Sequence, residues 1–519
     1  MSVQPRFPGV RARRAAFPVH RLRTRRAARG PVRPVIHSRR RDAGPGPVDG
    51  AVAAVVVASF ERHVQAAVER AGLGPDDCVL IGFSGGADSL ALTASLQAIH
   101  AAGRGPRPLA LHVNHRLRPE ADADAERAVA LGEAMGVPVT VVPVDVGAWD
   151  RVLREGTESA ARAARYAALA SAAREWGVRW VAVAHTANDQ AETVLLRLAR
   201  GAGLDGLAGM REQSHRPVPL DPDESEVVPL WLLRPLLGLT RAQVERYVRA
   251  RGLVPIEDAS NVSPVYRRNV VRHSVLPELE RVAPGVIETI ARTATLLADD
   301  AAYLQAAAEA AAADIVGRAG RLVTVAREPL RNLHPALQRR VLILAAREAG
   351  VDPAGPTAER VEALRRAAVE GAVGRVIEVG GGVGAWVDYA SLALGPLESL
   401  EEDLRRVSGR PLMPAGSVEP LRAGTEIDLP LLNGWRLRGR VGPGDWCLRT
   451  RRAGDRVAVS RGRHRSLQDF LVDAKVAAYL RDWLPLLERD GLIVWVAGVP
   501  SLSFDDAGTT LRCERLEGD

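Results

Sequence analysis

The sequence predicts an α/β protein with a doubly wound parallel sheet, followed by a helical domain and a small α+β domain. Three observations lead to this fold class. Short apolar runs alternate with helical segments between residues 79 and 200, the pattern of a parallel sheet covered by helices on both faces. Residues 281–400 are rich in alanine at helical spacing, and short strands separated by turns return from residue 431.

Composition divides the chain further. Residues 1–50 hold 13 arginines and two aspartates, a formal charge of +11, whereas the whole chain is +8. The remainder therefore sums to 8 − 11 = −3, and the basic pI of about 10.0 reflects the tail. A segment rich in Arg and Pro with few aromatic residues cannot bury a core. We expect 1–50 to be a disordered tail, or translation from an early start codon, in preference to a secretory signal.

The first ordered region, 51–280, should hold the parallel sheet. Phe60, Val64 and Val68 lie at helical spacing and predict an amphipathic helix that ends before Gly72. The expected strands are 79–83, 109–113, 139–142 and 178–184, and the expected helices are 90–100, 120–135, 157–176 and 189–200. In such sheets ligands bind beyond the carboxyl ends of the strands.

One loop at such an end, Ser84-Gly85-Gly86-Ala87-Asp88-Ser89, stands between the first strand and the next helix. Free N–H groups at a helix start bind anions, and the glycines allow a phosphate to approach the backbone. The loop lacks the lysine of a Walker motif. Asp88 would repel a phosphate unless a cation lies between them, which indicates Mg²⁺. An ordinary Ser/Gly turn is the alternative.

Two further polar motifs follow other strands. His112, Asn114 and His115 end the second strand, where a histidine alone is more often structural. His185 ends the fourth strand, and Asp189 and Glu192 then share one face of a helix start. These carboxylates either cap the helix or, opposite a phosphate loop, bind Mg²⁺ and a cationic substrate.

The motifs occur in an order that resembles a known family. After the phosphate loop and the segment 112–118 come ESAARAARY at 158–166, HTANDQAET at 185–193, RGAG at 200–203, RPLL at 234–237, EDASN at 257–261 and RNVVR at 268–272. Together they resemble the tRNA(Ile)-lysidine synthetases, which are PP-loop ATP pyrophosphatases with an adenine nucleotide α-hydrolase-like fold. The resemblance is strongest over 75–280. Asn188 departs from it, because aspartate is frequent at that position.

The resemblance implies a reaction and a set of site residues. The enzyme would use ATP and Mg²⁺ to join free L-lysine to C2 of the wobble cytidine of tRNA(Ile), through an adenylated base. The loop 84–89 with His112, Asn114 and His115 would bind ATP, and Asp88 and Asp189 would bind the metal. Asp88, His185, Asp189 and Glu192 would form the catalytic group. The candidates for tRNA binding are Arg234, Arg268, Asn269, Arg272, Arg461, Arg463 and Arg465, although each could equally serve as a structural ion-pair partner or a solvated residue.

By the same resemblance 281–400 would be a helical tRNA-contacting domain and 431–519 a C-terminal tRNA-binding domain, joined by a Pro- and Gly-rich linker at 401–430. The alanine-rich helices alone would suit a structural spacer equally well.

Cysteine usage and hydropathy limit the rival functions. Cys78, Cys447 and Cys513 are far apart and form no CxxC pair, which argues against zinc, iron–sulfur and disulfide sites. A tRNA thiolase of the same fold usually needs paired cysteines. An amidotransferase-type synthetase needs an ammonia source, and no glutaminase segment is evident. A non-catalytic tRNA-binding protein is the rival from another class. We expect a cytoplasmic protein without a membrane span, and a homodimer stays open beside a monomer.

Overall fold

The computed structural model of the chain describes residues 50–223, 226–256, 267–352, 355–371, 373–460, 463–499 and 508–516. The arginine-rich tail up to residue 49, the motif at 257–261 and Arg461 lie outside the described residues.

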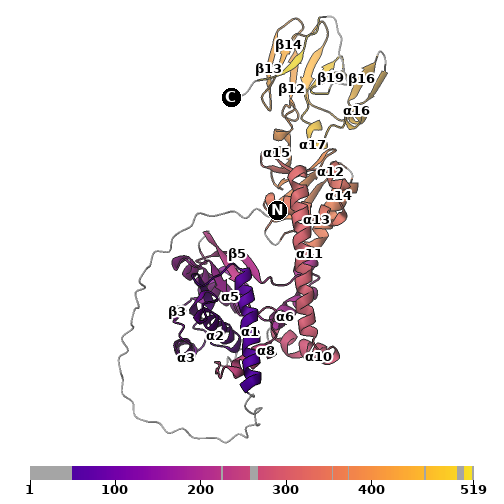
Figure 1. Cartoon of the computed structure of the whole chain (residues 1–519). Helices are drawn as coiled ribbons and strands as arrows, with labels where there is room; N and C mark the ends of the chain where they lie inside the picture. Colours follow the sequence, from indigo (N-terminus) through magenta and orange to yellow (C-terminus); the bar gives the residue numbers. More distant parts are fainter. Residues whose placement is uncertain are drawn as a thin grey trace. The chain divides into compact units, whose positions relative to one another are not determined.

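A six-stranded sheet forms the centre of the first domain (Figure 1). Its order is β3 (Val139–Pro143), β2 (Arg107–Asn114), β1 (Cys78–Gly82), β4 (Trp180–Ala182), β6 (Val227–Leu233) and β5 (Gln213–Pro219). The first five strands are parallel and β5 is antiparallel to β6. The helices of this domain are α1 (Gly50–Arg70), α2 (Ala87–Ala101), α3 (Ala121–Ala134), α4 (Val146–Leu153), α5 (Thr157–Glu175), α6 (Ala187–Leu198), α7 (Leu204–Leu207) and α8 (Arg241–Ala250).

Alternate residues of the central strands enter two different cores. Val79 and Ile81 of β1 pack with α1, α2 and α8, whereas Leu80 packs with the alanine-rich face of α5. In β4 the neighbours Trp180 and Val181 divide in the same way. Because side chains of a strand alternate between the two faces of the sheet, both faces are covered by helices. The predicted doubly wound parallel sheet is confirmed.

Strands β5 and β6 were not expected from the sequence. Their prolines argue against a central strand, since proline donates no ladder hydrogen bond. The structure accommodates them by position: Pro217 of the edge strand β5 lies opposite Pro229. Pro229 precedes Trp231, the first β6 residue that pairs with β4, so its missing N–H interrupts no bond to β4.

Helix α1 supplies the hydrophobic face predicted from its spacing. Phe60, Val64, Ala67 and Val68 are buried, and the Phe60 ring stacks on Tyr247 of α8 with ring centroids 4.1 Å apart. Among the helices of the described residues, α1 alone has the length and apolar composition to cross a membrane. Its buried face nevertheless packs on the sheet domain.

Residues 267–407 combine helices with a second sheet. The helical elements are α9 (Arg267–Val270), the π-helical turn η2 (Val271–Val275), α10 (Leu276–Val282), α11 (Val286–Ile315), α12 (Arg327–Asn332), α13 (Pro335–Glu348), α14 (Ala358–Glu370) and α15 (Leu400–Val407). An antiparallel sheet joins β7 (Val316–Ala319), β8 (Leu322–Ala326), β11 (Ser391–Pro396), β10 (Val383–Val387) and β9 (Val376–Gly380) in that order. The sequence predicts the helices at 286–313, 334–349 and 357–370, but only a short hairpin around 376–394 of this five-stranded sheet.

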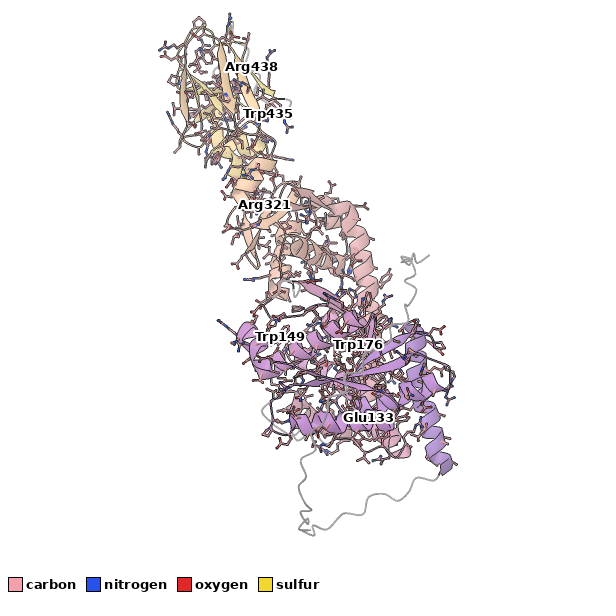
Figure 2. All side chains as sticks on the ribbon, turned by 90° about the vertical axis from the view of Figure 1, so that its left-hand side faces the viewer. Glu133, Trp149, Trp176, Arg321, Trp435 and Arg438 are labelled. Atoms are coloured by element: carbon pink, nitrogen blue, oxygen red, sulfur yellow. The ribbon has the colours of Figure 1, made fainter. Side chains whose placement is uncertain are left out.

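The C-terminal region is rich in β-structure. One sheet joins β12 (Val418–Leu421), β15 (Trp446–Arg449), β18 (Leu486–Arg489), β19 (Leu492–Val496), β16 (Arg456–Ser460) and β17 (Arg463–Ser466), and a second joins β13 (Ile427–Leu431), β14 (Trp435–Gly439) and β20 (Arg512–Arg515). The short helices α16 (Leu467–Asp473) and α17 (Ala478–Arg481) complete it. Trp435 and Arg438, labelled in Figure 2, belong to β14. The stretch expected as a linker, 401–430, contains most of α15, β12 and the start of β13.

Candidate active site at the carboxyl ends of the parallel strands

The loop between β1 and α2 is built to accept an anion. Gly86 is the N-cap of α2 and has no side-chain cap, so no side chain satisfies the first N–H groups of that helix. Gly85 has φ of +79°, and a Cβ there would lie 2.5 Å from Cδ1 of Ile256. Only glycine therefore fits this turn without strain. The hydroxyls of Ser84 and Ser89 lie 3.1 Å apart and brace the loop.

Asp88 is the carboxylate of this loop, and one of its two oxygens lacks a partner. Its Oδ1 is buried with no hydrogen-bond partner, and its Oδ2 lies 3.5 Å from Nη2 of Arg241. Burial raises the pKa of Asp88, while Arg241 opposes the shift and the nearby Asp189 adds to it. A buried carboxylate oxygen without a partner is costly, so Asp88 suits a cation that arrives with the ligand.

The polar residues that end β2 have mixed roles. Nδ1 of the buried His112 donates to the Phe83 carbonyl at 3.0 Å, and burial lowers the pKa of His112. Asn114 donates to Asp122 at 2.7 Å and accepts from the backbone N–H of Arg116 at 3.0 Å. It therefore braces the turn after β2. Nδ1 of His115 is buried without a partner, and burial followed by the charge of Arg165 lowers its pKa to about 4.

The third motif begins with His185 and the start of α6. Nδ1 of His185 is buried without a partner, and its pKa is lowered to about 3, chiefly by burial. Asp189 and Thr186 form a capping box, in which Oδ2 of Asp189 accepts from the N–H and the hydroxyl of Thr186 at 2.8 Å each. The capping role that the sequence left open thus occupies one oxygen of Asp189.

Asp189 and Glu192, which we call the acidic pair, contact two arginines through their remaining oxygens. Glu192 is completely buried, and its two oxygens accept from Nε of Arg268 at 2.5 Å and Nε of Arg272 at 2.6 Å. Oδ1 of Asp189 accepts from Nη2 of Arg268 at 2.7 Å. Burial of Asp189 favours its neutral form, but Arg268, His185 and the Thr186 hydrogen bonds outweigh it and lower its pKa. Asp189 is therefore held in its charged form, and both carboxylates are paired with arginines.

Three family models match the chain: a PP-loop domain at residues 57–279, the TilS substrate binding domain at 326–387 and the TilS substrate C-terminal domain at 447–513. The chain is 34% identical over 471 residues to a protein of Symbiobacterium thermophilum named tRNA(Ile)-lysidine synthase, covering 85% of this chain and 93% of that protein. The protein of the same name from Dehalococcoides mccartyi is 31% identical, covering 84% and 94%.

The chain belongs to the tRNA(Ile)-lysidine synthase family. The resemblance inferred from the motifs is thereby confirmed. Among solved structures, the U34-tRNA thiolase NcsA of Methanococcus maripaludis matches with a TM-score of 0.39 and 18% identity, covering 48% of this chain and 80% of that one.

In this lysidine synthase family member, the arginines proposed for tRNA binding have different surroundings. Nη1 of the buried Arg234 donates to the Arg211 carbonyl at 2.7 Å and the Ser214 hydroxyl at 2.9 Å. Arg268 and Arg272 face the acidic pair, and Asn269 lies between them on α9. In the C-terminal sheet Arg463 is exposed, whereas Arg465 pairs with Asp473 at 2.5 Å.

The candidate ligands for a metal ion in this lysidine synthase family member are Asp88 and Asp189. Within the described ranges no three His, Cys, Asp or Glu side chains are grouped to hold one. Mg²⁺ is usually bound by one or two carboxylates together with substrate phosphates. The unpartnered oxygen of Asp88 beside the phosphate loop fits such a site, whereas Asp189 could join it only if Arg268 withdrew.

Sequence reasoning missed Arg241 and the role of Asn188. Oδ1 of Asn188 accepts the backbone N–H of Arg241 at 2.8 Å and so caps α8. That cap places the Arg241 guanidinium near Asp88. The signal was present, because Thr240 and Gln243 form a capping box that marks a helix start directly before Arg241.

Proposed function

We propose that this protein is an ATP-dependent ligase that joins L-lysine to C2 of the wobble cytidine of tRNA(Ile) with a CAU anticodon, in the cytoplasm. The observation that carries the chemistry is the phosphate loop, in which one oxygen of Asp88 has no partner, near Asp189, which shares Arg268 with the buried Glu192. The substrate identity rests on the family relationship, whose members named above cover most of the chain.

The reaction would proceed in two displacements. The C2 oxygen of the cytidine attacks the α-phosphate of ATP, an O–P bond forms, and pyrophosphate leaves with the electrons of the anhydride bond. The ε-amine of lysine then attacks C2, loses a proton, and displaces AMP. The base must leave its stack to reach the loop, and holding both nucleophiles in turn is the main task of the protein.

Different residues of the chain would carry out the different parts of this reaction. The N–H groups at the start of α2 and the Ser84 and Ser89 hydroxyls hold the leaving pyrophosphate. Asp88 would hold Mg²⁺, which neutralises phosphate charge when bound. Glu192 and Asp189 would receive an ammonium group of lysine. His185 and His115, kept neutral by burial, could accept a proton at Nδ1.

For lysine to bind, Arg268 and Arg272 would have to break their ion pairs with the acidic pair. A guanidinium and an ammonium carry the same charge, so the exchange leaves Glu192 compensated. The two arginines lie on α9 and the π-helical turn η2, and single π-helical turns are frequent at functional sites.

The experiment is mass analysis of nucleosides from tRNA(Ile) incubated with the full chain, ATP and lysine. We expect a cytidine heavier by lysine less one water, together with AMP and pyrophosphate. Omission of lysine should leave ATP–pyrophosphate exchange intact, since adenylation precedes lysine attack. A sulfur-containing nucleoside, or tRNA binding without ATP consumption, would reject the proposal. Light scattering of the same preparation distinguishes a monomer from a homodimer.

A further inference from the structure

Three arginines surround one buried tyrosine near the candidate active site, and a fourth interacts with them. Tyr166 of α5 is 2% exposed, and the guanidinium carbons of Arg162, Arg165 and Arg216 lie 5.1, 5.5 and 5.1 Å from its ring centroid. Arg234 is the fourth member, since its charge interacts with Tyr166, Arg162 and Arg216. We call these four residues the arginine cluster.

The arginine cluster lacks a counter-charge. No carboxylate of the described residues lies within ion-pair distance of any of its four members, whereas Arg70, Arg174 and Arg251 of the same domain each have one. Arg162 donates to the Tyr166 hydroxyl at 3.0 Å, and Arg234 donates to neutral acceptors and keeps a buried Nε without a partner. Cation–π contacts attract a cation to the ring but neutralise none of its charge, so four like charges remain together uncompensated.

The nearby carboxylate Asp189, whose charge acts on His185, is paired with Arg268 and not with the cluster. His115 and His185, whose Nδ1 atoms are buried without partners, both feel the charge of Arg165. Burial lowers the pKa of Arg165 and of Arg234. Glu158, one helical turn before Arg162, interacts instead with Arg268. The cluster thus adjoins the predicted catalytic histidines and carries a positive charge that suits an anion.

We propose that the arginine cluster binds the phosphodiester backbone of the tRNA beside the target base. This inference rests on the proposed function and names where the catalytic domain itself holds the RNA. Four cations exceed what the single carboxylate of lysine requires. Arg162 on α5 and Arg216 on the edge strand β5 are exposed, as contacts to a long polyanion must be, whereas Arg165 and Arg234 lie deeper and would fix the register.

Two substitutions remove the exposed members of the cluster, together with their contacts to Tyr166: Arg162→Gln and Arg216→Gln in one chain. The matched control is Arg174→Gln on the same helix α5, because Arg174 is exposed and already paired with Glu226 at 3.3 Å. Affinity of the full-length protein for tRNA(Ile) is measured against KCl concentration, and melting temperature confirms that each variant is folded.

The double variant should bind tRNA on the order of tenfold more weakly near physiological salt, and its log–log salt slope should fall by about 1.4, or about 0.7 for each lost single-strand phosphate contact. Arg165→Gln should lower the slope by about 0.7. The Arg174→Gln control should match the wild type, and the KM for lysine should not change in any variant.

Unchanged tRNA affinity and salt slope in the double variant would overturn the inference. An alternative outcome also overturns it: a raised KM for lysine with unchanged tRNA binding and unchanged turnover of 1,5-diaminopentane, which lacks the carboxylate, would assign the cluster to the lysine carboxylate. Because tRNA binding is measured without catalysis, a wild-type protein that makes no lysidine would reject the proposed function while the binding comparison still decides the inference.

Discussion

The carboxylates of the candidate active site fall into two groups with opposite surroundings. Asp88, in the phosphate loop, has one arginine at 3.5 Å and a buried oxygen without any partner. Glu192 is completely buried, yet both its oxygens are paired with Arg268 and Arg272. The difference indicates two modes of ligand binding. We propose that Asp88 gains a cation from the ligand, whereas Glu192 and its neighbour Asp189 exchange one cation for another.

The largest effect should come from Asp88→Asn. We expect ATP–pyrophosphate exchange with tRNA to fall at least ~100-fold, as when one group that stabilises developing charge is removed. Melting temperature at pH 8 should not fall, because burial raises the pKa of Asp88 and its ionised form is a cost to the fold. Asp76→Asn, at an exposed position, is the control. Near-normal exchange by the folded Asp88→Asn protein would show that this carboxylate binds no essential cation.

Glu192→Ala tests the other group through stability. Removing the buried carboxylate leaves Arg268 and Arg272 without their Nε acceptor, and losing one partner of a buried pair costs about 3 kcal/mol. Urea denaturation measures this difference in the free energy of unfolding. Glu226→Ala, which breaks only the exposed pair with Arg174, should cost less than ~1 kcal/mol. Equal losses in the two variants would mean that Glu192 is not held by ion pairing.

The histidines beside the two groups make stability depend on pH. His115 and His185 have pKa values lowered to about 4 and about 3, so between those values and 6.5 the unfolded chain binds more protons than the native one. Stability therefore decreases as pH falls below 6.5, by about 1 kcal/mol per histidine between pH 6.5 and 5.5. Unfolding of wild type and His115→Gln across this range measures the slope, which the substitution should reduce. An unchanged slope would contradict the buried neutral state of His115.

The sequence predicted one group better than the other. Asp88 lies within a short contiguous motif after an apolar strand, so its place beside a helix start followed from local pattern. The strands 79–83 and 109–113 were found for the same reason, and the structure has β1 at Cys78–Gly82 and β2 at Arg107–Asn114. The pairing of Glu192 with Arg272 joins residues 80 positions apart. Local periodicity contains no information about such a contact, so the sequence does not decide between tRNA binding and structural ion pairing for either arginine.

The sequence does not predict two other features of the structure: the strands β5 and β6, and the arginine cluster. Both β5 and β6 contain proline, which argues against a central strand. In the structure Pro217 and Pro229 lie opposite each other. The arginine cluster draws on α5, β5 and the residue after β6, and in an arginine-rich chain no single member is distinctive. Only the fold reveals that these arginines share a tyrosine and lack carboxylates.

The smallest effect should separate two arginines of the C-terminal sheet. Arg463 is exposed on β17, and no ion pair involves it among the described residues, whereas Arg465 pairs with Asp473 and lies 5.7 Å from the Phe470 ring centroid. We expect Arg463→Gln to lower the salt slope of tRNA binding by about 0.7. Arg465→Gln should lower it less, because an arginine already paired releases fewer counterions when it contacts a phosphate. Neither variant should change the KM for ATP, since the phosphate loop lies in another domain. If ATP binding weakened while tRNA affinity and its salt slope stayed constant, the C-terminal sheet would contribute to nucleotide binding and not to the tRNA contact proposed for it.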